Sequence, residues 1–158
     1  MANVVLTRID DRLIHGQVMT AWVKTTKANR IIIVDDVVAK DDFMKKVLSM
    51  AAPTGIKVDA FTVEEASTAL KEESKEDERI IILVKVPQTV ERMLNNGVEI
   101  KDIIVGGIGA APGRKRLYKN ISISEEERQS FLNILDMGTE VNVRIVPDDR
   151  PQPIKSCL

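Results

Sequence analysis

The chain contains a single histidine, His15, and the residues around it are of types that handle phosphate. It lies in the segment Arg-Ile-Asp-Asp-Arg-Leu-Ile-His-Gly-Gln-Val, residues 8–18, after the first apolar run and before the first helical pattern. Connecting loops of this kind are where proteins usually display reactive groups. An imidazole is partly unprotonated at neutral pH and can act as a nucleophile, and Arg12 carries a planar cationic fork that suits phosphate oxygens. The segment therefore predicts phosphate chemistry centred on His15.

Two other uses of a histidine find no support in the sequence. A metal site is not expected, because the one histidine and the one cysteine, Cys157, stand at opposite ends of the chain and cannot form the usual sets of nitrogen and sulfur ligands. A serine hydrolase is not expected either, because no Gly-X-Ser-X-Gly segment presents a serine. The remaining alternative is a histidine without a chemical role, at the surface or buried with its hydrogen bonds satisfied.

Segment 8–18 resembles the amino-terminal active-site motif of the IIB components of the mannose, fructose and sorbose family of bacterial phosphotransferase sugar-uptake systems. The likeness extends through most of the chain, with Ile-Ile-Ile-Val-Asp-Asp at residues 31–36, Val-Lys-Val-Pro-Gln at 84–88 and Ile-Ile-Val-Gly-Gly-Ile-Gly at 103–109. The resemblance implies that His15 accepts a phosphoryl group from a phosphohistidine of the IIA partner. It also implies that His15 passes the group to a sugar crossing the membrane-embedded IIC and IID components, and that Arg12 is the arginine of the motif.

The same resemblance sets expectations for partners and location. The protein would be a phosphotransferase that needs no cofactor, because the nitrogen–phosphorus bond of the donor already has a high transfer potential. It would be cytoplasmic, held at the inner face of the membrane through IIC and IID, and a homodimer is common among relatives. Mannose, fructose, sorbose and amino sugars all remain open as the sugar.

Composition and length give bounds of their own. At 158 residues, 44% hydrophobic and 30% charged, the chain is expected to form a single domain over residues 1–158. A net charge of −1 and 3% aromatic residues argue against a nucleic-acid surface. The first residues lack the layout of a signal peptide, and no apolar stretch approaches the ~18 residues of a membrane span, so the chain is expected to stay in the cytoplasm.

Apolar runs alternate with helical patterns along the whole chain. Runs rich in Ile and Val predict strands at residues 4–6, 30–34, 56–61, 79–84, 102–105 and 140–146. Helical patterns occupy residues 17–25, 40–52, 63–73, 89–96 and 124–137. Most of the strands are continuously apolar, which is typical of strands covered on both faces. The prediction is an α/β fold with an open, mostly parallel sheet, helices on both faces and room for an antiparallel edge strand.

In such a sheet, ligands bind outside the carboxyl ends of the strands. The backbone N–H groups of Gly16, Gln17 and Val18 would begin the first helix there and favour an anion. Either Asp10 or Asp11 is a candidate to hold the second ring nitrogen of His15, and two adjacent acids are also ordinary loop composition.

Residues after the first, second and fifth predicted strands could form the rim of the site. Asp11, Asp35, Gly107 and Gly109 are the candidates. The segment 107–112 resembles a dinucleotide fingerprint except at its last position, where Pro112 stands. A turn lining the histidine with backbone amides is the preferred interpretation, and a purely structural turn is the alternative. Arg8 is interpreted as a surface charge at a strand end or as a helper of the loop. The alternative function is a non-catalytic nucleotide-binding regulatory module that uses the same crevice.

Overall fold

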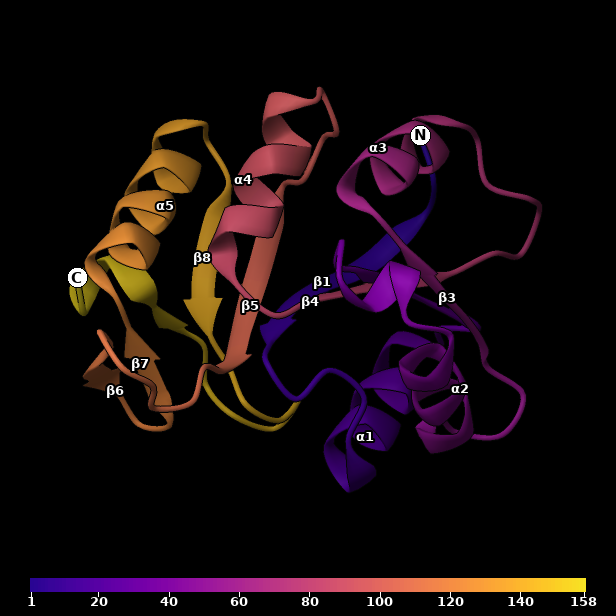
Figure 1. Cartoon of the computed structure of the whole chain (residues 1–158), viewed down its shortest axis with the longest axis horizontal. Helices are drawn as coiled ribbons and strands as arrows, with labels where there is room; N and C mark the ends of the chain where they lie inside the picture. The colour runs from indigo at the N-terminus through magenta and orange to yellow at the C-terminus, as the bar shows by residue number, and fades with distance from the viewer.

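The central feature of the structure, a computed structural model that describes residues 1–158, is a sheet of seven strands in the order β3-β2-β4-β1-β5-β8-β9 (Figure 1). The strands are β1 (Val4–Asp10), β2 (Arg30–Val34), β3 (Lys57–Phe61), β4 (Ile80–Val84), β5 (Asp102–Gly107), β8 (Glu140–Val143) and β9 (Gln152–Pro153). All neighbouring pairs are parallel except β8 and β9, which pair antiparallel at one edge. The predicted mostly parallel sheet with an antiparallel edge strand is confirmed.

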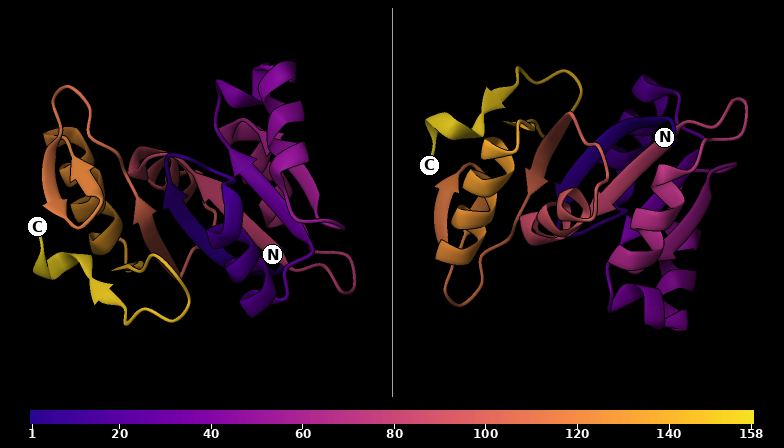
Figure 2. Two further views of the ribbon diagram at one scale, coloured as in Figure 1. Left: turned by 90° about the horizontal axis from the view of Figure 1, so that it is seen from below. Right: turned by 90° about the horizontal axis from the view of Figure 1, so that it is seen from above.

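Helices cover both faces of the sheet, as the sequence predicted (Figure 2). The helices are α1 (Gly16–Thr26), α2 (Asp42–Ala51), α3 (Val63–Lys71), α4 (Pro87–Asn95) and α5 (Glu125–Asp136), with short 3₁₀ turns η1 (Val38–Lys40) and η2 (Ile154–Ser156). Buried side chains of α1 and α2 share one apolar cluster with the sheet, and those of α3, α4 and α5 share the other. None of the helices combines the length and apolar character needed to cross a bilayer.

Local sequence signals explain where these elements stand. Strands β2 and β4 consist almost entirely of Ile, Leu and Val because both of their faces are covered. Helices α3 and α5 both begin with a capping box, Thr62 with Glu65 and Ser124 with Glu127, in which side chain and backbone satisfy each other's free groups.

Some predicted boundaries were wrong. The first strand continues to Asp10 rather than ending near Leu6, and the last long strand ends at Val143 rather than Val146. An antiparallel hairpin of β6 (Lys115–Tyr118) and β7 (Ile121–Ile123), beside the carboxyl terminus, was not predicted (Figure 1).

The topology places a switch point of the sheet at the end of β1. This strand lies between β4 and β5, the chain leaves it through α1 toward β2 on one side, and β5 lies on the other side. In open α/β sheets, ligands bind outside the carboxyl ends of the strands, at the point where the order of the strands reverses. The fold therefore points to the loop that joins β1 to α1.

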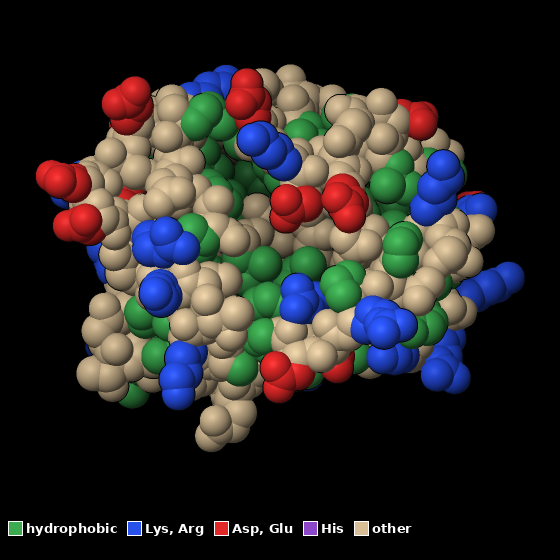
Figure 3. Space-filling model, turned by 180° about the vertical axis from the view of Figure 1, so that it is seen from behind, with side chains coloured by type: hydrophobic (Ala, Val, Ile, Leu, Met, Phe, Trp, Pro, Cys, Tyr) green, Lys and Arg blue, Asp and Glu red, His purple; other side chains and the backbone are tan.

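The face of the molecule drawn in Figure 3 shows basic and acidic side chains interspersed with apolar ones, and no histidine. No single basic patch stands out on that face. The only histidine of the chain, His15, is therefore not visible on this face.

Candidate active site

Asp10, the last residue of β1, binds several groups of the loop that follows it. Its side chain is 0% exposed. Oδ1 accepts hydrogen bonds from the backbone N–H of Arg12 at 3.1 Å and from Nε of Arg12 at 3.0 Å. Oδ2 lies 3.0 Å from Nη2 of Arg12, 3.3 Å from Nη2 of Arg8 and 3.0 Å from Nε2 of His15. One buried carboxylate therefore joins two arginines to the histidine.

These contacts keep Asp10 ionised. Burial by itself raises the pKa of this carboxyl, because it penalises the charged form. The hydrogen bonds from Arg12 and His15 and the charge of Arg8 outweigh burial, so the pKa of Asp10 lies below its ordinary value. In the opposite sense, the hydrogen bond to Asp10 raises the pKa of Arg12. The site holds a permanent negative charge against two cations.

Two apolar residues anchor the loop between Asp10 and His15. Leu13 and Ile14 are 3% and 5% exposed and belong to the apolar cluster under α1. The backbone N–H of Leu13 donates to the carbonyl of Asp10 at 2.9 Å, and Leu13 has a φ of 58°, a left-handed conformation that a leucine rarely adopts. With Leu13 and Ile14 turned inward, Arg12 and His15 remain at the surface.

His15 stands immediately before α1 and caps its amino end with the backbone only. No side chain accepts a hydrogen bond there, and the first turn contains no acidic residue. The N–H groups of Gly16, Gln17 and Val18 belong to the first turn and have no partner within the helix. Together with the helix dipole they favour an anion beside the histidine.

The contact between His15 and Asp10 determines which ring nitrogen is free. An ionised carboxylate can only accept hydrogen bonds, so Nε2 must carry the proton that lies between the two groups. In the neutral imidazole the lone pair is then on Nδ1. The His15 side chain is 22% exposed, so the ring is accessible to a reactant.

The glycine segment after β5 lies against this loop. Oδ2 of Asp11 accepts a hydrogen bond from the N–H of Gly109 at 2.7 Å, and the N–H of Asp11 donates to the carbonyl of Gly107 at 3.1 Å. A β-carbon at Gly107 would stand 3.2 Å from Nη2 of Arg12 and 3.0 Å from Nδ2 of Asn120. The structure thus brings Asp11, Gly107 and Gly109 to the rim where the sequence analysis placed them.

Asp35 has a different role in the structure. Its Oδ1 accepts hydrogen bonds from the N–H groups of Val37 and Val38 at 3.0 and 2.9 Å and so stabilises the turn before η1. It forms no hydrogen bond or ion pair with His15, Arg12 or the other residues of the loop. Asp35 is therefore not part of the hydrogen-bonded site.

Arg8 is the residue whose role the sequence analysis left open, between a surface charge and a helper of the loop. The interpretation as a surface charge was wrong, since its side chain is 0% exposed and its guanidinium lies beside Asp10. Trp22 on α1 and the backbone of Arg144 after β8 complete its surroundings. The sequence held no local signal for this burial, because these partners come from distant segments of the chain.

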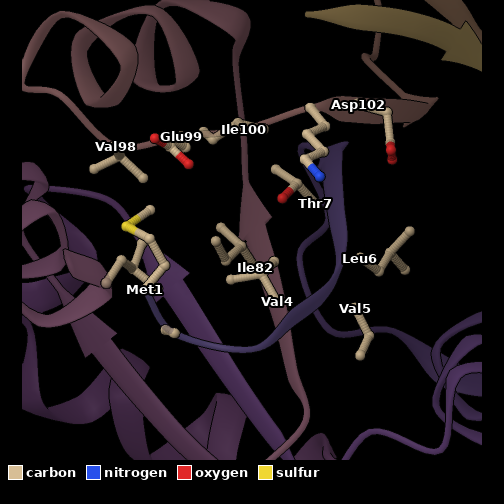
Figure 4. Close-up of a pocket in the computed structure, with 13 residues that line it drawn as sticks. Met1, Val4, Val5, Leu6, Thr7, Ile82, Val98, Glu99, Ile100 and Asp102 are labelled. Carbon is tan, nitrogen blue, oxygen red and sulfur yellow. The ribbon is translucent and has the colours of Figure 1, made fainter. Parts of the chain in front are cut away.

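A cleft of about 360 Å³ lies at the other end of β1 (Figure 4). It arises because β5 pairs with β1 only from Arg8 onward, which leaves Val4 to Thr7 without a neighbour on that side. Its lining includes Met1, Leu70 and Ile100 and is mostly apolar. None of the residues around His15 takes part in it, so this cleft is separate from the candidate site.

The fold and the site together define an α/β protein that presents an imidazole, held by a buried aspartate between two arginines, at the carboxyl edge of a parallel sheet. A family model described as the PTS system sorbose subfamily IIB component, where PTS is the phosphotransferase system, matches residues 4–158. The chain belongs to this family of sugar phosphotransferase components.

Named relatives agree with the family assignment. The chain is 38% identical over 147 residues to the sorbose-specific EIIB component of Klebsiella pneumoniae, covering 93% of this chain and 90% of that protein. It is 34% identical over 158 residues to the fructose-specific EIIB component of Bacillus subtilis, covering 100% and 97%.

Solved structures share the fold. The IIBSor domain of the sorbose permease from Klebsiella pneumoniae superposes with a TM-score of 0.92 at 36% identity, covering 98% of this chain and 94% of that one. The N-acetylgalactosamine-specific IIB component 1 from Escherichia coli gives a TM-score of 0.90 at 32% identity, covering 95% and 98%. The expectation of a IIB component of the mannose and sorbose type is confirmed.

Proposed function

We propose that His15 is the phosphoryl carrier of this IIB component and that Nδ1 is the atom that carries the group. The observation that supports this proposal most is the 3.0 Å contact between Nε2 of His15 and the ionised Asp10, which leaves the lone pair on Nδ1 of a partly exposed ring. In the proposed reaction, Nδ1 attacks the phosphorus of a phosphohistidine on the IIA component. The nitrogen–phosphorus bond of the donor breaks, and both of its electrons stay on the donor nitrogen.

The surroundings of the ring suit both charges that the reaction produces. After transfer the ring keeps its proton on Nε2 and becomes a cation, which the carboxylate of Asp10 stabilises. The phosphoryl oxygens carry negative charge, and the exposed half of Arg12, whose side chain is 48% exposed, is available to pair with them. The free N–H groups of Gly16, Gln17 and Val18 add partial positive charge at the start of α1. Asp10 thus stabilises the cationic ring, and Arg12 stabilises the phosphoryl group.

The second half-reaction passes the group to a sugar. A sugar hydroxyl oxygen forms the new bond to phosphorus and loses its proton, and Nδ1 recovers its lone pair. We infer that this step takes place at the membrane-embedded IIC and IID components and that the chain works at the inner face of the membrane. The relatives are named as specific for different sugars, among them sorbose, fructose and N-acetylgalactosamine. We therefore propose that the substrate is a hexose or an amino sugar.

The IIA partner has support of its own. The chain is 37% identical over 144 residues to the mannose-specific EIIAB component of Escherichia coli. The match covers 91% of this chain and 45% of that protein. Its name joins a IIA and a IIB component in one polypeptide. We propose that the donor of this chain is likewise a IIA component.

Phosphorylation of the purified chain tests the proposal. The wild-type chain, incubated with phosphoenolpyruvate, the general phosphotransferase proteins and a IIA component of the family, is expected to gain one acid-labile phosphoryl group. Nitrogen and phosphorus NMR of the only histidine would assign the group to Nδ1. The variant His15→Ala is expected to gain none, whereas Thr20→Ala, a change at an exposed site on α1, should react like the wild type.

Arg12→Ala separates binding of phosphate from folding. The variant should keep the fold, because Asp10 retains Arg8, and should transfer the group more slowly. Label on the His15→Ala chain, or a wild-type transfer rate for Arg12→Ala, would remove the corresponding residue from the mechanism.

A further inference from the structure

Arg8 is a buried cation in a position that its neighbours fill with apolar side chains. It lies on the face of β1 covered by α1, and the residues paired with it on β4 and β5 are Leu83 and Ile104. Burying a guanidinium costs free energy unless partners compensate for the lost water. Burial also lowers the pKa of Arg8 from its ordinary value, against the opposing effect of Asp10. An aliphatic residue would avoid this cost, so the charge at this position needs an explanation.

One contact of Arg8 leads directly to the histidine, and two others hold the guanidinium in place. Nη2 lies 3.3 Å from Oδ2 of Asp10, the same oxygen that meets Nε2 of His15. Nη1 donates to the backbone carbonyl of Arg144 at 3.0 Å, and the guanidinium carbon lies 5.5 Å from the centre of the Trp22 ring. Nε has no hydrogen-bond partner although it is buried. The side chain thus gives up one hydrogen bond and keeps its ion pair with Asp10.

The backbone of β5 leaves room for this guanidinium. A β-carbon built at Gly106 would overlap Cζ and Nη2 of Arg8 and would stand 2.7 Å from Nε. The ring of Trp22 also lies beside the guanidinium, and its position is fixed because its Nε1 donates to the carbonyl of Ile145 at 3.0 Å. The guanidinium is therefore enclosed and cannot turn away from Asp10 without moving α1 or β5.

We propose that Arg8 is the positioning residue of the site: it holds the carboxylate of Asp10 so that Oδ2 meets Nε2 of His15 and the reactive lone pair stays on Nδ1. This inference rests on the proposed function of His15. Arg12 cannot fill the same role throughout the reaction. Its side chain is 48% exposed, so it divides its charge between Asp10 and the phosphoryl oxygens once the group has been transferred. Arg8 is then the cation that remains beside the carboxylate.

A pair of substitutions separates positioning from folding. Arg8→Leu removes the cation, and Gly106→Ala places a methyl group where the guanidinium lies. In the double variant the methyl group fills space that the shorter leucine leaves empty, so the double variant should be more stable than the sum of the two single changes predicts. Arg30→Leu is the matched control, because Arg30 is a partly buried arginine of β2 that pairs with Asp59 and Glu78, at the opposite end of the sheet from His15.

The first measurement is NMR of the ring nitrogens of His15, which is unambiguous because the chain has one histidine. The wild type is expected to show the Nε2–H form with a proton protected from exchange with water. Arg8→Leu and the double variant should lose this protection and show some Nδ1–H form, whereas Arg30→Leu should keep the wild-type signals. This measurement needs no phosphoryl donor, so it tests the positioning role even if His15 proved not to be a carrier.

The second measurement is transfer from phosphorylated IIA. The rate at saturating donor should fall about tenfold or more in Arg8→Leu and in the double variant, as for groups that orient other functional histidines, with KM unchanged. Arg8→Lys should recover part of the rate, because it restores the charge without the planar fork. If neither leucine variant folds, Arg8→Lys decides by the same two measurements. The proposal would be overturned if the folded double variant kept a protected Nε2–H proton and the wild-type rate. Where neither leucine variant folds, the same result for Arg8→Lys would overturn it.

Discussion

The substitution Asp10→Asn is the most direct test of the charge network in this site. Asparagine has the shape of aspartate, but one of its two terminal atoms is a donor. At Oδ1 it would face two N–H groups of Arg12, and at Oδ2 it would face N–H groups of Arg8, Arg12 and His15. Whichever way the amide is turned, its NH₂ group meets donors. The change therefore removes at least two hydrogen bonds and leaves Arg8 buried without a counter-ion.

The magnitude follows from that last consequence. Removing one partner of a buried ion pair costs about 3–5 kcal/mol, which is a large part of the about 5–15 kcal/mol by which a typical domain is stable. The neighbouring change Asp11→Asn is the matched control. Asp11 is 29% exposed, and its carboxylate accepts one hydrogen bond, from the N–H of Gly109. Its replacement should cost only about 0.5–1.5 kcal/mol.

Urea unfolding followed by circular dichroism measures both variants, and Trp22, the only tryptophan, reports on the site by fluorescence. The pKa of Asp10 is lower in the folded chain, so its carboxylate stabilises the fold fully above the ordinary aspartate value of about 3.9, and this stabilisation is lost as the pH falls through the folded pKa. The difference between wild type and Asp10→Asn should therefore shrink below about pH 4. Equal losses for Asp10→Asn and Asp11→Asn at neutral pH would refute the reasoning.

Three further outcomes are expected. Glu127→Gln should lower the free energy of unfolding by about 1–3 kcal/mol, because Glu127 pairs with Arg114 at 2.8 Å and accepts from the N–H of Ser124. Burial opposes ionisation of Glu127, but the hydrogen bonds from these groups outweigh it and lower its pKa, so the difference should shrink as the pH falls below about 4, and a difference that does not shrink there would contradict the assignment. Trp22→Phe removes the hydrogen bond to the carbonyl of Ile145 and should cost about 1–2 kcal/mol in urea unfolding; no loss would mean that the indole N–H contributes nothing. Phe43→Ser, at a side chain that is 75% exposed, should change the free energy of unfolding by less than about 0.5 kcal/mol, and a larger loss would show that this residue is packed in solution.

The fold was predictable from the sequence wherever burial is two-sided. After an initial arginine, the runs 30–34 and 79–84 are entirely apolar, which has few explanations other than a strand covered on both faces. The end of β1 was not predictable in this way, because Thr7, Arg8 and Asp10 interrupt the apolar pattern although all three are buried. Their partners come from distant segments, and a local pattern does not contain that information.

The hairpin of β6 and β7 escaped prediction for a different reason. Its strands have four and three residues, and the first begins with the exposed pair Lys115 and Arg116. Short strands with a basic start give little periodic signal. A contact between segments, the bridge of Ile108 to Ile121, attaches the hairpin to the rest of the fold, and this too is invisible along the sequence.

The candidate site divides in the same way. Asp10, Arg12 and His15 stand within six residues of one another, so their meeting in one loop could be predicted from their spacing. Arg8 could not be assigned, because what fixes it is the absence of a side chain at Gly106 and a carbonyl at Arg144. Residues close together along the chain predicted the chemistry, and residues distant along the chain supply the contacts that hold them.

The place of β1 in the middle of the sheet also bears on how the protein is made. During translation this strand leaves the ribosome first, whereas its two flanking strands, ending at Val84 and Gly107, follow much later. Until β5 has emerged, the nascent polypeptide lacks the strand that covers Arg8 and Asp10 on one side. A chain whose synthesis stops before Gly107 therefore carries the whole motif in its covalent structure and still lacks the assembled site.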